Sequence, residues 1–189
     1  MTDRVFWAVE FPASIRAQLV AAQQALRAAC EDAPVRWVRA EQLHLTLKFV
    51  GEVEDVGALV GAVQKAVHRT GALQLEVAGL GTSGKKAIWA GVGGPDAPRL
   101  AQLAATVDES LEALGVPREQ QAFAPQVTLG RARGGRRPGR GVSALQPALS
   151  SLEVAPLPFL LEELVLYGSA QDQSGPAVYT ALERVSLLG

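Results

Sequence analysis

The sequence has few of the residues from which metal, disulfide and redox sites are built. Its 189 residues include one cysteine, Cys30, and two histidines, His44 and His68. A single cysteine excludes an intrachain disulfide, and we interpret Cys30 as a small, buried or half-buried thiol at the end of an amphipathic helix. With so few soft ligands and no tight acidic cluster, the sequence predicts neither a metal site nor a bound cofactor.

Long apolar runs and a strong net charge are also missing. The formal net charge is −1, so no global field favours nucleic acid. The opening residues, MTDRVFWAVEFPAS, contain no long hydrophobic stretch, so we expect neither a signal peptide nor a membrane span. We expect a cytoplasmic monomer. The sequence also has no phosphate-binding loop, dinucleotide fingerprint or nucleophile elbow, which excludes the commonest nucleotide-binding and serine hydrolase motifs.

Helical and strand patterns alternate along the chain. Apolar residues at helical spacing predict helices after Pro12, from about Glu54 to Arg69, and from Asp96 to Gly115. Runs rich in β-forming residues predict strands at 4–11, 35–38, 44–50, 72–80, 85–92, 124–130, near 151–155, and at 159–169 and 177–187. Helices intermingled with hairpins favour an α+β protein with mostly antiparallel sheets, assigned to one domain over residues 1–189.

Two of these strands carry related sequences, LHLTLKFVG (43–51) and FAPQVTLGR (123–131). Side chains alternate along a strand, so His44 and Thr46 share one face of the first copy. Gln126 and Thr128 share one face of the second. The two copies lie 82 residues apart, a spacing that hints at internal duplication.

These polar faces suit a phosphate group if they meet across a cleft. Each threonine hydroxyl can donate a hydrogen bond to a phosphate oxygen, and His44 can transfer a proton near neutral pH. Arg131, directly after the second motif, can add a charge-assisted hydrogen bond. The alternative is an ordinary exposed sheet in which threonines alternate with leucines. The pairing of two copies, one with a histidine, favours the phosphate site.

The two strands resemble the paired H-x-T-x motifs of the two-histidine phosphoesterases. RVFWAVEFP, RWVRAEQLHLTLKFVGEV, FAPQVTLGR and LVLYGS…GPAVYTAL are similar in order and spacing to segments of the RNA 2′,3′-cyclic phosphodiesterases, formerly called 2′-5′ RNA ligases. The resemblance implies a two-lobed, pseudo-duplicated α+β fold with flanking helices and a cleft between the lobes. It also implies metal-independent hydrolysis of a 2′,3′-cyclic phosphate at an RNA end to a 2′-phosphate.

The same resemblance implies roles for individual residues. One motif histidine acts as base toward water, and the other acts as acid toward the leaving 3′ oxygen. His44 matches the first histidine, and Thr46, Thr128 and Arg131 match substrate-binding positions. Gln126 stands where the second catalytic histidine is expected. The common assignment makes the N-terminal histidine the acid, but the sequence does not decide between the two roles.

A glutamine at this position separates binding from proton transfer. Its amide offers a donor and an acceptor at a size close to that of imidazole, but it carries no proton to exchange. We therefore expect the loss of one acid–base step, typically worth about 10²–10⁴-fold in rate. Gln126 is either natural or an engineered substitution, and the sequence leaves this open. Two alternatives to a weakened hydrolase follow, a non-catalytic RNA-end binding protein and 2′-5′ RNA end joining.

We expect the partners to be RNA ends or nucleotide cyclic phosphates, and we expect no membrane partner. Further residues bear on how such a ligand is bound. Five arginines fall within ten residues and form either a solvated loop or a phosphate-tracking arm: Arg131, Arg133, Arg136, Arg137 and Arg140. Base stacking needs an aromatic side chain near the cleft. The candidates, each also suited to the core, are Phe6, Trp7, Trp37, Phe49 and Phe123. We expect His68 to be a solvated surface residue.

Overall fold

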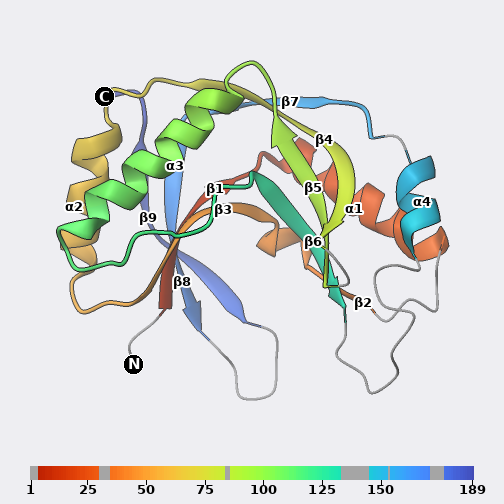
Figure 1. Ribbon diagram of the computed structural model, residues 1–189, viewed down its shortest axis with the longest axis horizontal. Helices are drawn as coiled ribbons and strands as arrows, with labels where there is room; N and C mark the ends of the chain where they lie inside the picture. Colours follow the sequence, from red (N-terminus) through yellow and green to blue (C-terminus); the bar gives the residue numbers. More distant parts are fainter. Residues whose placement is uncertain (1–3, 30–34, 84–85, 133–144, 153, 171–176) are drawn as a thin grey trace.

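Two antiparallel sheets lie side by side in the computed structural model, with helices packed around them (Figure 1). The structure describes residues 4–29, 35–83, 86–132, 145–152, 154–170 and 177–189. The strands are β1 (Arg4–Glu10), β2 (Val35–Trp37), β3 (His44–Glu52), β4 (Leu73–Ser83), β5 (Ala87–Gly93), β6 (Gln126–Ala132), β7 (Leu157–Leu161), β8 (Glu163–Ala170) and β9 (Val178–Ser186). The helices are α1 (Ala13–Ala29), the 3₁₀ turn η1 (Ala40–Gln42), α2 (Val56–Val67), α3 (Ala97–Glu112) and α4 (Gln146–Ser151).

The sheet order brings the two motif strands together. One sheet has the order β3-β1-β8-β9 and the other the order β2-β6-β5-β4-β7. Neighbouring strands are antiparallel in both sheets. β3, at the edge of the first sheet, contacts β6 of the second, near the centre of the molecule (Figure 1). The expected α+β class with mostly antiparallel sheets is therefore confirmed.

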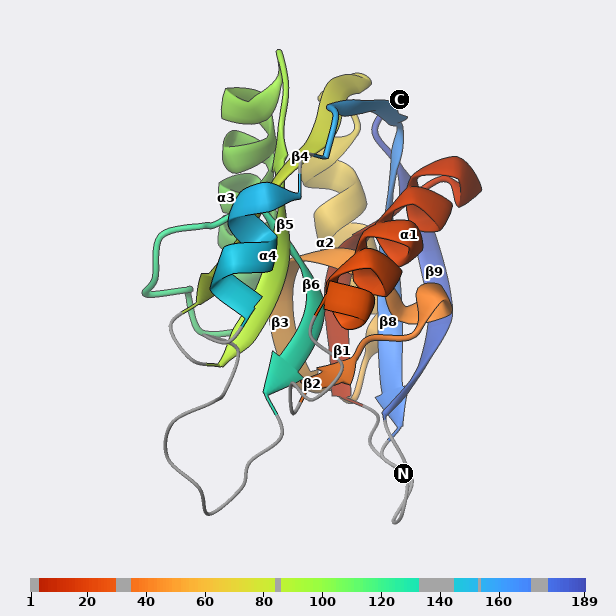
Figure 2. The same ribbon diagram turned by 90° about the vertical axis from the view of Figure 1, so that its right-hand side faces the viewer.

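The helices bury their apolar stripes around the sheets. α2 packs against α3 and β9, and α3 also contacts β3, whereas α1 contacts η1 and α4 (Figure 2). One continuous core joins both sheets and includes Trp7, Leu45, Val127 and Leu129. The alternate leucines and valines of the motif strands thus fill the core, and this leaves their polar residues on the opposite face.

Two helix boundaries show how local chemistry sets the element ends. The Asp55 side chain accepts a hydrogen bond from the Ala58 N–H at 2.9 Å, so α2 begins after this cap rather than at Glu54. Asp96 precedes α3 as expected, but its carboxylate accepts from the Gln74 N–H at 2.7 Å and does not cap the helix. It fastens the start of α3 to β4 instead.

The expectation of a strand near 151–155 was wrong. Residues 146–151 form α4, whose first turn contains Pro147 and whose Leu149 is buried in the core. Proline fits the first helical turn because its fixed φ suits a helix and its missing N–H has no intrahelical partner there. The expected strand at 159–169 is two strands, because β7 pairs with β4 whereas β8 pairs with β1 in the other sheet.

β3 also differs from expectation, since it continues through Gly51 instead of ending there. Gly51 has a φ of 94°, which glycine adopts without the steric cost of a side chain. Cys30 and the arginines at 133, 136, 137 and 140 lie outside the described residues. Among the residues that the structure describes, no helix is long and apolar enough to cross a membrane.

Candidate active site

The first motif strand contains a bulge that turns one more side chain toward the cleft. His44, Thr46 and Phe49 pair with alternate residues of β1, because an extra residue is inserted at Leu47. Alternate residues of a strand share a face, and directly paired residues point the same way. His44, Thr46 and Phe49 therefore share one face of β3.

The second motif strand has the same irregularity at the equivalent place. Gln126, Thr128 and Arg131 pair with alternate residues of β5, and the extra residue is Leu129. All three side chains therefore lie on one face of β6. Strict alternation would point Arg131 away from Thr128, so the bulge is what joins the arginine to the motif.

These two faces meet at His44. Burial of the imidazole lowers the pKa of His44, the Gln42 carbonyl opposes this effect, and the positive charge of Arg131 lowers the pKa further. β3 and β6 contact each other, so these residues of the two motif strands lie on neighbouring strands.

Hydrogen bonds fix the orientation of the His44 ring. Nδ1 lies 2.7 Å from the Gln42 carbonyl oxygen, and Nε2 lies 3.1 Å from Thr46 Oγ. A carbonyl oxygen only accepts, so Nδ1 carries the proton in the neutral ring. Nε2 then presents its lone pair beside the Thr46 hydroxyl. His44 is arranged to exchange a proton through Nε2.

An aromatic wall, formed by Phe6, Tyr167 and Tyr179, surrounds the imidazole. The His44 ring centroid lies 5.0 Å from that of Phe6, 5.3 Å from that of Tyr179 and 6.1 Å from that of Tyr167. Burial, together with the nearby Glu10 carboxylate, raises the pKa of Tyr167 to about 12. Its hydroxyl therefore keeps its proton at neutral pH.

A cavity of about 590 Å³ adjoins the aromatic wall. Phe6 and Tyr179 line it, as does Phe49, whose side chain is 66% exposed. Among the five aromatic residues considered for base stacking, Phe6 and Trp7 are buried, and Trp37 and Phe123 pack against the core. Phe49 is thus the most exposed of the five stacking candidates.

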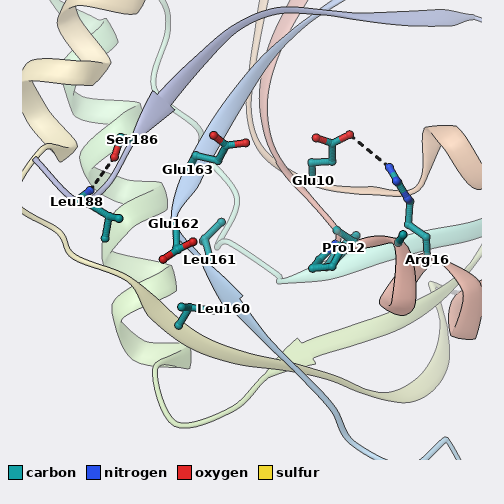
Figure 3. Close-up of a pocket in the computed structure, with 11 residues that line it drawn as sticks. Glu10, Pro12, Arg16, Leu160, Leu161, Glu162, Glu163, Ser186 and Leu188 are labelled. Atoms are coloured by element: carbon teal, nitrogen blue, oxygen red, sulfur yellow. Dashed lines mark hydrogen bonds and ion pairs between the residues drawn. The ribbon is translucent and has the colours of Figure 1, made fainter.

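A second cavity, of about 530 Å³, lies beside Glu10 and the start of α1. Its lining includes the carboxylates of Glu10, Glu162 and Glu163, and Figure 3 shows Arg16 directed at Glu10, which it contacts at 3.3 Å. Carboxylates repel a phosphate. The cavity near Phe49 is less acidic, because its charged lining residues are one carboxylate, Glu52, and one guanidinium, Arg4.

Sequence reasoning missed a polar residue that supports the second motif. Gln23 is buried in α1, and its Nε2 donates to the Val38 carbonyl at 2.9 Å and to the Leu129 carbonyl at 2.8 Å. Leu129 is the bulge residue, and its carbonyl also accepts from the Val38 N–H at 2.9 Å, so two donors meet it where the strand pairing is irregular. Its signal was present, because Gln23 falls between Leu19 and Leu26 on the apolar stripe of α1.

Lys48 attaches the first motif strand to α3 from the opposite face. Its Nζ lies 2.6 Å from Asp108 Oδ1 and 2.6 Å from the Pro117 carbonyl oxygen, with 3% of its side chain exposed. The apolar pattern of β3 gave no signal for this buried ion pair. It holds the motif strand through a charge pair on the side away from the cleft.

The other candidate residues lie away from this site. His68 is exposed at the end of α2, and its Nδ1 lies 2.8 Å from the Lys65 carbonyl oxygen, as expected for a surface residue. Within the described residues, no group of three or more His, Cys, Asp or Glu side chains is arranged to hold a metal ion. The polar groups that the two motifs place on these faces are an imidazole, an amide, two hydroxyls and a guanidinium.

Comparisons with known proteins agree with this duplicated site. The model of the LigT like Phosphoesterase family matches residues 9–92 and again residues 92–178. A Thermus thermophilus RNA 2′,3′-cyclic phosphodiesterase is 32% identical over 198 residues, which cover 98% of this chain and 91% of that protein. A Geobacillus stearothermophilus protein of the same name is 32% identical over 160 residues, or 81% of this chain. The match spans about half, 48%, of the Geobacillus protein.

Solved structures show the same fold. E. coli LigT complexed with 3′-AMP superposes with a TM-score of 0.71 at 26% sequence identity, and the match covers 100% of both chains. Each of the two matches to the family model contains one motif strand, β3 in the first and β6 in the second. The chain belongs to the LigT-like phosphoesterase family.

Proposed function

We propose that this protein binds RNA ends that carry a 2′,3′-cyclic phosphate and hydrolyses them to 2′-phosphates, at a rate lowered by Gln126. The observation that carries the proposal is the convergence of β3 and β6, which brings the charge of Arg131 to His44. The names of the relatives, RNA 2′,3′-cyclic phosphodiesterases, support the substrate class. We further propose that residues 1–189 act as one two-lobed, monomeric, cytoplasmic domain.

The phosphate binds between the two motif strands in this proposal. The hydroxyls of Thr46 and Thr128 donate hydrogen bonds to its oxygens. Arg131 adds a charge-assisted hydrogen bond, which is about twice as strong as a neutral one. Because this charge stabilises the negative phosphate as the new bond forms, we propose that the reaction needs no metal.

Hydrolysis needs two proton transfers at opposite sides of the phosphorus. A water oxygen attacks phosphorus and loses a proton, while the bond to the 3′ oxygen breaks and that oxygen gains a proton. His44 serves one of these transfers through Nε2. Gln126 can hold the water or the phosphate oxygen at the other side, but its amide does not ionise. The reaction therefore proceeds with one of the two transfers left to solvent.

The base of the terminal nucleotide stacks on Phe49 in this proposal. Phe49 shares the cleft face of β3 with His44 and lines the cavity beside the aromatic wall. Aromatic stacking tolerates any base, because every base has a π face. A stacked base on β3 and a phosphate held between β3 and β6 would orient the nucleotide across the cleft.

The decisive experiment is an assay with an oligonucleotide that ends in a 2′,3′-cyclic phosphate. We expect slow conversion to a 2′-phosphate end, identified by separating the 2′- and 3′-phosphate products. Adding an oligonucleotide with a 5′-hydroxyl end tests the second candidate, because end joining would give a 2′-5′ linked product. Tight binding with no turnover at any enzyme concentration would instead favour the RNA-end binding protein to which Gln126 points.

A further inference from the structure

A second arginine lies beside Arg131 on the same face of the five-stranded sheet. β2 pairs with β6 so that Arg36 is directly opposite Arg131 and Trp37 is opposite Gly130. Val35 and Trp37 both approach the position that a side chain at Gly130 would occupy, so these two residues lie on the other face. Arg36 is therefore left on the cleft face with Arg131.

This arrangement is unfavourable in the absence of an anion. Neighbouring strands are about 4.7–4.9 Å apart, and like charges directly opposite each other destabilise a sheet. Both arginines are exposed, and within the part of the chain that the structure describes neither guanidinium has an ion-pair partner. A phosphate between the two side chains would replace this repulsion with two charge-assisted contacts.

We propose that Arg36, together with Arg131, binds a second phosphate group of the RNA, the phosphodiester that precedes the terminal nucleotide. This inference rests on the proposed function, in which the terminal phosphate lies between Thr46 and Thr128. Arg36 is one strand farther from Thr128 than Arg131 is. Its charge therefore serves a neighbouring phosphate rather than the one that is hydrolysed.

The position of β2 gives the RNA a path away from the cleft. β2 is the edge strand of the five-stranded sheet, so a chain that passes over Arg36 meets no further strand of that sheet. Phe49 lies on the other sheet and holds the terminal base in the proposed binding mode. The two sheets would thus contact different parts of the substrate, with the base on β3 and the phosphates along β6 and β2. Because a mononucleotide has no second phosphate to contact Arg36, this binding mode predicts a preference for oligonucleotides over mononucleotides.

A binding titration of the unmodified protein tests the assignment. The probes are adenosine 2′-phosphate and the dinucleotide whose 3′-terminal residue carries a 2′-phosphate, so they differ by one nucleotide and its phosphodiester. We expect the dinucleotide to bind about tenfold more tightly, within the range for a hydrogen bond to a charged group. Arg36→Gln should abolish this preference and leave the mononucleotide affinity within about twofold. Arg36→Lys should retain part of it, because lysine keeps the charge but not the bidentate geometry.

Salt dependence and a matched control complete the test. For the dinucleotide, the slope of log affinity against log salt should fall by about 0.7 in Arg36→Gln, the value for one phosphate of a single strand. Arg69→Gln removes an exposed charge beyond α2, outside the cleft, and should change neither affinity nor slope. Equal weakening of both probes by Arg36→Gln, or equal wild-type affinity for both, would overturn the assignment. Failure of the wild type to bind either probe would instead reject the proposed phosphate site itself.

Discussion

Phe49 and Arg131 occupy equivalent positions in the two motif strands. Each lies five residues after the first motif residue, and each is turned onto the cleft face by a bulge, at Leu47 in β3 and at Leu129 in β6. The duplicated backbone therefore presents an aromatic ring from one sheet and a guanidinium from the other. A nucleotide has one group for each, because its base stacks and its phosphate is charged.

The first prediction follows from this difference in chemistry. Phe49→Ala should weaken binding of adenosine 2′-phosphate by about 1–3 kcal/mol, the usual value of one base–aromatic stack. The salt dependence should stay unchanged, because no charge is removed. Phe49→Tyr keeps the ring and serves as the control. Equal loss of affinity for ribose 2-phosphate, which has no base to stack, would show that Phe49 does not stack on the base.

The pairing of His44 with Thr46 could be predicted from the sequence, whereas the direction of Arg131 could not. Strand alternation is local, so it fixes the first pair once the strand is recognised. The bulge at Leu129 arises in the pairing with β5, and its carbonyl accepts hydrogen bonds from Gln23 and the Val38 N–H; all these contacts join residues distant in sequence. Simple alternation gives the wrong face for Arg131.

The position of Arg36 beside Arg131 also depends on contacts between residues that are distant in sequence. Its neighbour across the strands is set by the register of β2 with β6, which are about 90 residues apart in the chain. A short extended stretch before the first motif was expected, but its partner strand was not. Most elements and the motif residues were therefore readable from the sequence, whereas α4, the division between β7 and β8, and the non-local pairings that orient the arginines were not.

The second prediction concerns the pKa of His44. Burial and the charge of Arg131 lower it, so the imidazole should titrate below its ordinary value of about 6.5 in the free protein. Arg131→Gln should raise this pKa, because one of the lowering contributions is removed. Proton NMR of the imidazole resonances measures the pKa of His44 in both proteins. A lower pKa for His44 in Arg131→Gln would contradict the proposed convergence of the two strands.

The lowered pKa of His44 also makes the stability of the fold depend on pH. The folded pKa of His44 is lowered, so the unfolded chain binds more protons between the two pKa values. The contribution of His44 to stability is therefore fully present above about pH 6.5 and declines as the pH falls toward the folded pKa. His44→Gln should flatten this part of the curve of unfolding free energy against pH.

The third prediction concerns the buried ion pair behind the first motif. Lys48→Met leaves the Asp108 carboxylate buried without its closest partner, which should cost about 3–5 kcal/mol of unfolding free energy. The double change Lys48→Met with Asp108→Leu should recover much of this loss, since both charges are gone. Urea unfolding measures all three proteins. Glu163→Gln, which breaks an exposed pair with Arg184, is the control and should cost less than about 1 kcal/mol.

The Asp108 pair also gives a pH dependence of known direction. Burial alone would raise the pKa of Asp108, but the hydrogen bond from Lys48, the Glu119 N–H and the charge of Arg118 outweigh it and lower the pKa. Because the folded pKa of the carboxylate is lowered, Asp108 contributes stability above its unfolded pKa of about 3.9. This contribution is lost as the pH falls through the folded pKa. Acid unfolding of the double variant should therefore show a smaller loss over this range.

The fourth prediction is that turnover is independent of divalent metal. The positive charge at the proposed phosphate site comes from Arg131, and the proton transfer from His44. Hydrolysis of a cyclic-phosphate oligonucleotide should proceed at the same rate with and without EDTA. The reverse result, loss of activity in EDTA and recovery with one particular metal, would require ligands that the proposal does not include.

The last prediction returns to the glutamine. Gln126→His should raise the rate of hydrolysis by about 10²–10⁴-fold, the usual contribution of a general acid or base. Residue 126 shares the face of β6 with Thr128 and Arg131, so an imidazole there meets the phosphate from the strand opposite His44. The amide already supplies a similar shape and hydrogen bonds, so ligand affinity should change much less than the rate. A change confined to the transition state lowers the barrier without strengthening ground-state binding.

Single-turnover cleavage of a cyclic-phosphate end, paired with a titration of the 2′-phosphate product, separates these two effects. The restored protein should show a bell-shaped pH profile, because two imidazoles then titrate as acid and base. The present sequence should show a single ionisation, that of His44. His44→Ala should abolish the residual rate, and Gln126→Asn, which keeps an amide but shortens it, should not raise it. If Gln126→His is no faster than the parent, residue 126 takes no part in proton transfer, and the RNA-end binding function becomes the better account.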